Sequence, residues 1–196
     1  MLHPHTELRF VSPEIGYGIF ATHFIPKGTI TWVLDELDRV ILKEEVEKFS
    51  PANKENLIHY TYRDSKGNYI FCWDLTRYIN HGFNPNSMIT PLGFEVAIQD
   101  IHPGDEITND YGTLNILEPF KCAKDPHHTR EWVRPDDIKL MHKEWDLQIS
   151  EALPLVPDQL QPLYKFLTEK QKADIEQMTK NGKSIPSILN NLCLGD

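Results

Sequence analysis

The stretch "RYINHGFNPNS", Arg77 to Ser87, places an asparagine and a histidine side by side between a hydrophobic run and a turn. Gly82 and Pro85 follow this pair closely, and both residue types are typical of turns. Asn80 and His81 are therefore either ordinary loop residues or part of a site. The segments that surround them in the sequence decide between these two interpretations.

Two further segments combine glycine with aromatic or polar residues. Upstream, "GYGIFATHFIPKG" (Gly16 to Gly28) has two glycines around Tyr17, directly before an apolar run. Glycine lets the backbone approach a ligand closely, so this turn can lie along a small polar molecule with Tyr17 over it. Downstream, "GDEITNDYG" (Gly104 to Gly112) follows a turn and ends in Asp110-Tyr111. A tyrosine at a strand end can orient a reacting group through its hydroxyl, and it can equally be a core residue.

Short apolar runs separated by turn residues dominate the sequence up to position 120. These runs are "LRFV", "GIFATHFI", "TITWVL", "RVIL", "NYIFCW", "SMITPL" and "FEVAIQ". Gly, Pro, Asn and Asp stand between them, which predicts many short strands in a compact β domain. One helix is expected inside this domain, with Ser50 as its N-cap and Pro51 at its first position.

Helix signals dominate the remainder of the chain. Asp136 is expected to cap a helix with one apolar face, formed by Ile138, Met141 and Trp145. A capping-box pattern precedes a second helix, whose boundaries are Thr168 with Gln171 at the start and Asn181-Gly182 at the end. The i, i+3, i+4, i+7 spacing predicts a final amphipathic helix, with the stripe Ile185, Ile188, Leu189 and Leu192. The chain is thus predicted to be mainly β with helices (α+β), divided into residues 1–122 and a helical extension, residues 123–196.

The net charge of the chain indicates which classes of partner the protein can bind. The 196 residues include 29 acidic and 20 basic side chains, which give a formal net charge of −9. Proteins that bind nucleic acids usually carry a basic surface, so no direct contact with nucleic acid is expected. A basic peptide would be attracted instead, although an acidic composition also serves solubility alone.

Cysteine usage and the terminal segment bear on location. Cys72, Cys122 and Cys193 are odd in number and widely spaced, so they predict no disulfide framework and no paired zinc ligands. The segment "MLHPHTELRF" lacks the pattern of a signal peptide, and no apolar run has the length of a membrane span. We therefore expect an intracellular protein, cytoplasmic or nuclear, without membrane association.

In this order and spacing, the three glycine-containing segments resemble those of the SET-domain protein lysine methyltransferases. "GYGIFATHFIPKG" is similar to the N-terminal G-x-G segment of that family, and "RYINHGFNPN" is similar to its R-F-I-N-H-S-C-x-P-N motif. "GDEITNDYG" resembles its G-E-E-L-T-x-D-Y-G motif. Each motif alone is ordinary, but the combination is specific, and the resemblance extends over roughly residues 6 to 122.

The resemblance implies both a fold and an activity. The fold would be a SET-domain β-clip with a pseudoknot, in which the Asn-His segment threads beneath the loop that carries Asp-Tyr, followed by the helical extension. The activity would be S-adenosylmethionine-dependent N-methylation of a lysine in a histone or another protein. Two alternatives stay open, namely a catalytically weak SET-fold module that binds a peptide or protein, and an assembly adaptor. The target, the number of methyl groups added, the organism and the oligomeric state are not predicted.

The resemblance also assigns residues to the cofactor. S-adenosylmethionine would contact the residues Gly16, Tyr17, Gly18, Asn80, His81, Tyr111 and Phe120. Among these, Asn80 would bind the polar amino-acid end, since an amide offers a donor and an acceptor without adding charge. The backbone of His81 would meet the adenine, and Phe120 would lie against the adenine face.

Tyr111 is the predicted catalytic residue. Methyl transfer from a sulfonium to an amine is an in-line displacement, in which much of the acceleration comes from positioning. The lysine must first lose its proton, and a nearby positive charge together with an apolar channel lowers the pKa of the amine. No dedicated base is then required, and the Tyr111 hydroxyl, helped by backbone carbonyls, would lie near the transferring methyl group.

Several positions depart from the family pattern. Gly82 and Phe83 stand where the family usually has Ser and Cys. In the strand "GTITWVLDE" the family commonly has a tyrosine, and the register here places Leu34 at that point with Trp32 nearby. The substrate channel is therefore assigned to Trp32 and Leu34, with possible substitutes for the missing hydroxyl in Tyr60, Tyr62 and Tyr69. Many family members also have a zinc-binding cysteine cluster after this domain. No metal is expected here, because Cys122 lacks cysteine partners and the nearby His127 and His128 are interpreted as solvated.

Overall fold

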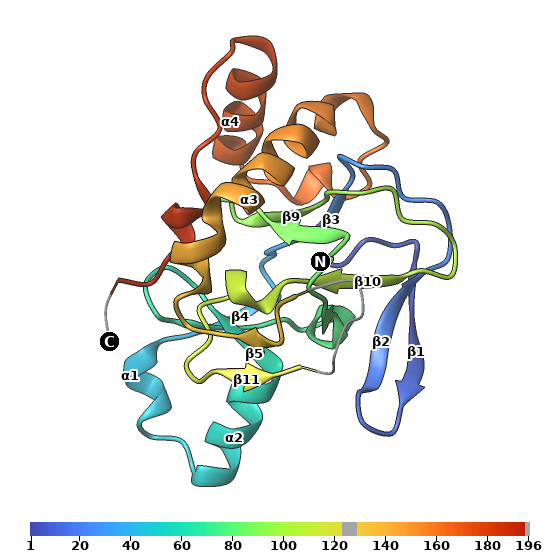
Figure 1. Cartoon of the computed structure of the whole chain (residues 1–196). Coiled ribbons are helices and arrows are strands. Elements are labelled where there is room, and N and C mark those ends of the chain that lie inside the picture. Colours follow the sequence, from blue (N-terminus) through green and yellow to red (C-terminus); the bar gives the residue numbers. More distant parts are fainter. Residues whose placement is uncertain (123–128, 195–196) are drawn as a thin grey trace.

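The computed structural model describes residues 1–122 and 129–194 and has the predicted α+β architecture (Figure 1). One four-stranded sheet has the order β1-β2-β10-β7, and its strands are β1 (Thr6–Ser12), β2 (Gly16–Ala21), β10 (Glu106–Asn109) and β7 (Asn80–His81). A three-stranded sheet has the order β3-β9-β8, with β3 (Ile30–Val33), β9 (Phe94–Ala97) and β8 (Ser87–Ile89). The apolar runs of the sequence therefore form strands as predicted.

Two smaller sheets contain the remaining strands. One has the order β4-β6-β5 and consists of β4 (Arg39–Ile41), β6 (Tyr69–Phe71) and β5 (Thr61–Arg63). The other is the two-stranded pair β11 (Phe120–Lys121) and β12 (Trp132–Val133). This second pair follows the Asp110-Tyr111 segment and brings Phe120 back toward it.

The helices are α1 (Lys43–Val46), α2 (Pro51–Tyr60), α3 (Asp137–Ala152) and α4 (Glu169–Lys180). Three of them, α2, α3 and α4, begin where the capping residues predict, and the short α1 was not predicted. Ser50 Oγ accepts from the amide of Asn53 at 3.3 Å, and Thr168 with Gln171 forms the predicted capping box of α4. Asp136 precedes α3 without a capping hydrogen bond from its side chain. No helix of the described residues is long and apolar enough to cross a membrane.

The end of the chain differs from the prediction. The stripe that begins at Ile185 does not form an amphipathic helix, and only a short 3₁₀ turn, η5 (Ile188–Asn191), follows it. Pro186 explains the difference, because proline lacks an N–H and disfavours helical conformation in the residue before it. Ile188 is nevertheless fully buried, so this segment packs on the core as irregular chain.

Helix α3 covers the three-stranded sheet and completes the main core. Ile138, Trp145 and Ile149 of α3 are at most 2% exposed and join Trp32 and Phe94 of the sheet in one hydrophobic cluster. The helix runs across β9 in Figure 1. This core thus includes residues on both sides of the domain boundary predicted at position 122.

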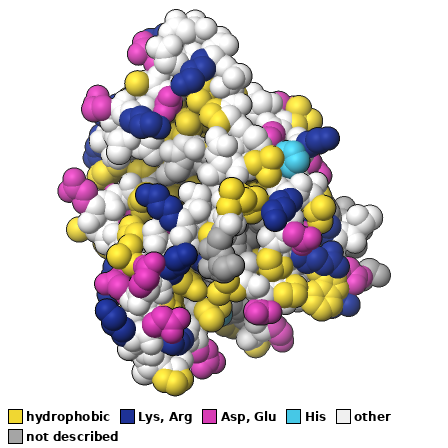
Figure 2. Space-filling model, turned by 90° about the vertical axis from the view of Figure 1, so that its left-hand side faces the viewer, with side chains coloured by type: hydrophobic (Ala, Val, Ile, Leu, Met, Phe, Trp, Pro, Cys, Tyr) yellow, Lys and Arg dark blue, Asp and Glu magenta, His cyan; other side chains and the backbone are white. Residues whose placement is uncertain are grey.

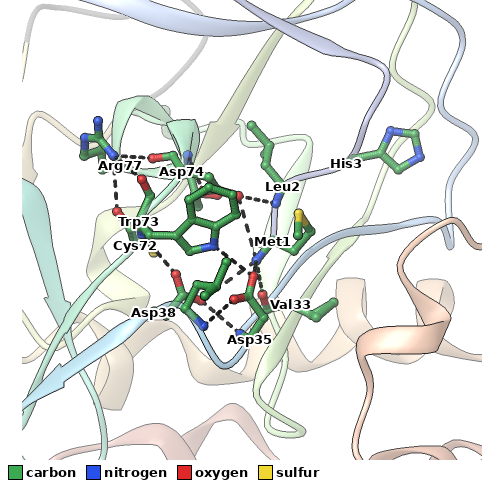
Figure 3. Close-up of polar contacts among 12 residues, drawn as sticks. Met1, Leu2, His3, Val33, Asp35, Asp38, Cys72, Trp73, Asp74 and Arg77 are labelled. Carbon is green, nitrogen blue, oxygen red and sulfur yellow. Dashed lines mark hydrogen bonds and ion pairs between the residues drawn. The ribbon is translucent and has the colours of Figure 1, made fainter.

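The first residue of the chain is held in an acidic cluster (Figure 3). The Met1 ammonium lies 2.8 Å from Asp35 Oδ2 and 3.8 Å from both Asp38 Oδ2 and Asp74 Oδ2. The indole N–H of Trp73 donates to Asp35 Oδ2 at 3.1 Å, and the backbone amide of Leu2 donates to Asp74 at 2.6 Å. These contacts tie the start of the chain to the loop after β3 and to the segment that leads toward β7.

Candidate active site

The predicted site forms where β7 lies parallel to β10. Asn80 is paired with Thr108 and His81 with Asn109, and the amide of Gly82 donates to the carbonyl of Asn109 at 3.0 Å. On its other side β10 pairs with β2, the strand that begins at Gly16. All three glycine-containing segments of the sequence therefore meet in one sheet.

The polar end of the site is formed by Asn80, Gly18 and Glu106. Asn80 Nδ2 donates to the carbonyl of Tyr17 at 3.0 Å and to Glu106 Oε1 at 2.6 Å. A Cβ atom on Gly18 would lie 2.2 Å from Glu106 Oε1 and 2.9 Å from Asn80 Nδ2. Glycine is thus required at position 18 for this arrangement. The result is a group of oxygen acceptors, including the Glu106 carboxylate, of the kind that suits an ammonium group.

Three rings form the aromatic end of the site. The His81 ring centroid lies 5.5 Å from that of Tyr111 and 6.1 Å from that of Phe120, and the last two are 6.3 Å apart. Burial lowers the pKa of His81, so the imidazole is neutral at neutral pH. His81 Nδ1 accepts from the amide of Tyr111 at 3.2 Å, which assigns the ring proton to Nε2. Nε2 is buried without a hydrogen-bond partner among the described residues.

The hydroxyl of Tyr111 is held by the backbone of the neighbouring segment. It donates to the carbonyl of Ile79 at 2.6 Å, directly before the Asn80-His81 pair. Burial and the nearby carboxylates of Glu95 and Glu106 raise the pKa of Tyr111, so the phenol stays protonated at neutral pH. The hydroxyl oxygen and the Ile79 carbonyl together present a polar spot within aromatic surroundings.

Arg130 fixes the loop that carries Tyr111. Its guanidinium pairs with Asp110 and lies 2.6 Å from Asp137 Oδ2 at the start of α3. The same group lies over the rings of Phe83 and Trp145, at 4.7 Å and 5.9 Å from the centroids. Arg130 thereby connects the segment after β7, the Asp110-Tyr111 loop and α3. Both carboxylates are almost fully buried, so the ion pairs are shielded from water.

The two departures next to the Asn-His pair fit this arrangement. Phe83 is 7% exposed, its ring lies 4.4 Å from that of His81, and it forms the surface on which Arg130 stacks. A Cβ atom on Gly82 would lie only 3.1 Å from Thr108 Oγ1, which is closer than most Cβ contacts. Gly82 therefore permits the close approach of β7 to β10.

The predicted channel residues occupy different surroundings. Trp32 is 1% exposed within the core, with the ring of Tyr62 edge-on at 5.8 Å, so it presents almost no surface to a ligand. The ring centroid of Tyr60 lies 6.3 Å from that of Tyr78, the residue directly before Ile79. The side chain of Leu34 is 39% exposed. Tyr69 lines a surface cavity with residues of α1 and lies beneath Arg63. The roles of these side chains in a channel stay predictions.

No group of His, Cys, Asp and Glu side chains in the described part of the chain is arranged to hold a metal ion. His127 and His128, the candidates considered with Cys122, lie outside the described residues. Burial raises the pKa of the Cys122 thiol.

Comparison with known proteins agrees with this arrangement. The family model for the SET domain matches residues 16–112, which extend from the first glycine segment to the end of the Asp-Tyr-Gly segment. Residues 16–112 form a SET domain. Among solved structures, a "putative histone methyltransferase" from Plasmodium falciparum is similar at 20% identity and a TM-score of 0.41, covering 56% of this chain and 95% of that one. Comparison with curated proteins gives no match.

Two residues of this SET domain and its extension were not predicted from the sequence. The sequence around Glu106 carries no local signal of a role for this residue. Its proximity to Gly18 and Asn80 depends on the pairing of β10 with both β2 and β7. Arg130 stands in a charged loop with no local signal. Its ion pairs depend on Asp110 and Asp137, which only the fold brings to the same place.

Proposed function

We propose that this SET domain is an S-adenosylmethionine-dependent protein-lysine N-methyltransferase. The observation that carries the proposal is that Gly18, Asn80 and Tyr111 come together where β7 pairs in parallel with β10. SET-domain methyltransferases use S-adenosylmethionine, a molecule with an ammonium and a carboxylate at one end and a flat adenine at the other. Its two ends match the two ends of the site in chemistry.

The residues present fit this cofactor. The Glu106 carboxylate and the side-chain carbonyl of Asn80 can accept from the α-ammonium of the cofactor, beside the backbone approach that Gly18 allows. The ring of Phe120, which is 36% exposed, offers a face to the adenine, and the buried Nε2–H of His81 needs an acceptor. A ligand with an ammonium group at one end and an adenine at the other would therefore pair with polar groups and cover a ring face that the protein's own residues leave without partners.

Each side chain then has a defined task in the reaction. S-adenosylmethionine supplies a methyl group on a positively charged sulfur. The neutral Tyr111 phenol and the Ile79 carbonyl, joined by a 2.6 Å hydrogen bond, orient the incoming amine so that its lone pair points along the line of displacement. The aromatic surroundings exclude water and lower the pKa of the lysine, which releases its proton before the transfer. Preorganised groups of this kind contribute typically about 10²–10³ in rate.

The substrate in this proposal is a lysine in a basic protein segment, such as a histone. The net charge of −9 favours approach of a basic polypeptide over a nucleic acid. On the face drawn in Figure 2, Lys and Arg side chains are interspersed with Asp and Glu and with apolar side chains. Local contacts rather than a large single-sign patch would therefore select the target sequence on that face.

Cofactor binding is tested first by calorimetry with S-adenosylhomocysteine, the demethylated product. We expect metal-independent binding that Asn80→Ala weakens about tenfold or more, since a buried polar group left without its partner costs about 1–3 kcal/mol. Asn84→Ala is the matched control, because Asn84 is an exposed amide in the same loop and should bind like wild type. Absence of binding to the wild type would contradict the cofactor assignment.

Methyl transfer is tested with labelled S-adenosylmethionine, a pool of histones and cell lysate, followed by mass spectrometry of labelled bands. Label on a lysine side chain, present with wild type and lost with Tyr111→Phe, is the expected result. Binding of S-adenosylhomocysteine without transfer to any protein would favour the alternative of a peptide-binding module with weak catalysis.

A further inference from the structure

A buried polar network includes Asn109 of β10, the strand paired with β7, and has no part in the reaction proposed above. At its centre is Glu95 of β9, whose Oε1 accepts from Asn109 Nδ2 at 2.5 Å and whose Oε2 accepts from Ser87 Oγ at 3.0 Å. Ser87 Oγ lies 2.6 Å from Thr31 Oγ1, and Thr113 Oγ1 lies 3.4 Å from Asn109 Oδ1. The network thus extends from the three-stranded sheet to the loop that follows β10.

Every member of this network is shielded from water. Glu95 is 6% exposed, Asn109 and Thr113 are 2% exposed, and Ser87 and Thr31 are fully buried. Both donors that reach the Glu95 carboxylate are neutral groups. A buried carboxylate without a cationic partner is costly, and an apolar residue in a central strand would stabilise the fold more. A buried residue that lowers the stability of the fold in this way is expected at a functional site.

The geometry connects Glu95 to the active site through one residue. Asn109 is the strand partner of His81, and it immediately precedes Asp110-Tyr111. The carbonyl of Asn109 also accepts from the amide of Gly82. A shift of Asn109 would therefore displace the Asn-His pair and Tyr111 together.

We propose that Glu95 is a positioning residue for methyl transfer, which holds Asn109 and through it sets the placement of Tyr111 relative to the Asn80-His81 segment. This inference rests on the proposed methyltransferase function. Glu95 contacts no reacting group, so its effect should appear in the rate of transfer more than in the affinity for cofactor.

The titration of Glu95 offers a readout that a purely structural role would not produce. Burial raises the pKa of Glu95 to about 7, although the donors Ser87 and Asn109 oppose the rise. The titratable groups that interact with it are Tyr62 of β5, Cys72 and Tyr111, and burial raises the pKa of each above the neutral range. Glu95 is therefore the group of this set that changes charge near neutral pH.

Two substitutions separate the contributions of shape and hydrogen bonding. In Glu95→Gln the amide can accept from Asn109 and donate to Ser87, which can in turn donate to Thr31, so the network is kept without charge. In Glu95→Leu the Asn109 amide and the Ser87 hydroxyl lose their acceptors. Thr90→Val is the matched control, because Thr90 is fully buried in the turn directly after β8 and its hydroxyl donates to the Phe94 carbonyl, outside the network.

The expected results follow from these roles. Glu95→Leu should lower turnover about 10²-fold with a much smaller effect on S-adenosylhomocysteine binding, since small displacements at a reacting centre cost rates of this order. Glu95→Gln should restore turnover to near the wild-type rate, and Thr90→Val should leave it unchanged. Wild-type turnover in Glu95→Leu, or an equal loss in Thr90→Val, would overturn the proposal.

A second measurement does not depend on activity. In nitrogen–proton NMR spectra of the full chain, the Asn109 side-chain amide and the Tyr111 backbone amide should shift with pH around neutrality in wild type and stay constant in Glu95→Gln. If neither amide signal shifts with pH in the wild type, the proposal is overturned, even if Glu95→Leu fails to fold. If wild type transfers no methyl group, the proposed function fails, while this titration still decides whether Glu95 controls the placement of Asn109 and Tyr111.

Discussion

The hydroxyl of Tyr111 shows how a single polar atom can be positioned by backbone rather than by other side chains. Its acceptor is the Ile79 carbonyl, and the Tyr111 amide is itself bound to His81 Nδ1. Both partners belong to the segment that also carries Asn80. The position of the hydroxyl is therefore determined by the same segment that carries Asn80 and His81, the residues proposed to bind the cofactor.

Tyr111→Phe removes this hydroxyl and keeps the ring. We expect turnover to fall about 10²–10³-fold while S-adenosylhomocysteine affinity stays near that of wild type, because the hydroxyl acts on the reacting groups. The free energy of unfolding should fall by only about 1 kcal/mol, the value of one hydrogen bond. Single-turnover kinetics and calorimetry measure the two effects. Tyr62→Phe is the comparison, and a loss of turnover there without a loss in Tyr111→Phe would move the catalytic assignment to Tyr62.

Glu95 predicts a specific dependence of stability on pH. Its pKa is raised from 4.5 to about 7 in the folded chain, so the folded state keeps a proton that the unfolded state releases between those values. Stability contributed by this residue is therefore present below about pH 4.5, falls as the pH rises toward 7, and is constant above that. Glu95→Gln does not titrate, so its unfolding free energy relative to wild type should rise by about 2–3 kcal/mol from pH 5 to pH 8. Urea unfolding across this range measures the difference, and a difference independent of pH would contradict the assignment.

Residue types in the three glycine-containing segments were sufficient to predict which residues meet at the site. Gly18, Asn80 and Tyr111 come together as expected, because the order and spacing of their segments are specific. Glu106 and Glu95 could not be assigned in the same way, since their significance depends on which strand each one faces. Glu95 in particular reads as an ordinary polar position in the run "FEVAIQ", yet it is buried.

At the level of elements, Arg130 joins three parts of the fold that are separate in sequence. Its partners lie in the Asp110 loop and at the start of α3, and its guanidinium stacks on Phe83 after β7. The β11–β12 pair ends near Arg130 and places Phe120 beside His81. An arginine and two carboxylates thus connect the segment after β7, the Asp110 loop and α3.

Arg130→Met should leave Asp110 and Asp137 buried without this cation. We expect the free energy of unfolding to fall by about 3–5 kcal/mol, as for other buried pairs that lose one partner, and S-adenosylhomocysteine affinity to fall about tenfold or more. Lys27→Met is the control, because Lys27 pairs at 2.8 Å with Glu151, whose side chain is 56% exposed, and such pairs contribute less than about 1 kcal/mol. Equal effects of the two substitutions on the free energy of unfolding in urea would show that the Arg130 ion pairs contribute no more stability than an exposed ion pair.

Local signals predict many of the elements, but they wrongly predict a final helix and do not predict the shortest strands. Ser50 and the Thr168-Gln171 pair mark true helix starts, since capping is a local interaction. The apolar stripe alone predicts a final helix, whereas Pro186 within the stripe disfavours one. The short strands β7, β11 and β12 could not be predicted, because strands of two residues exist only through their pairing.

For the whole molecule, the shared core predicts that residues 1–122 do not fold alone. Without α3, the side chains Trp32 and Phe94 would lose the cover of Ile138, Trp145 and Ile149, and loss of one such large side chain already costs about 3–5 kcal/mol. A chain that ends at residue 122 should show neither a cooperative thermal transition nor near-ultraviolet circular dichroism. Cooperative unfolding of that fragment would show that the helical extension is an independent appendage.

The parallel pairing of β7 with β10 also constrains when the protein becomes functional during synthesis. Strand β7 leaves the ribosome before β10, and Arg130 and Trp145, which hold the Asp110 loop, emerge later still. Domains fold as units while the chain grows from its N-terminus, and contacts between distant segments form late. A nascent chain therefore cannot assemble the proposed cofactor site until α3 has emerged, so a cofactor bound there would stabilise the fold only from that point of synthesis onward.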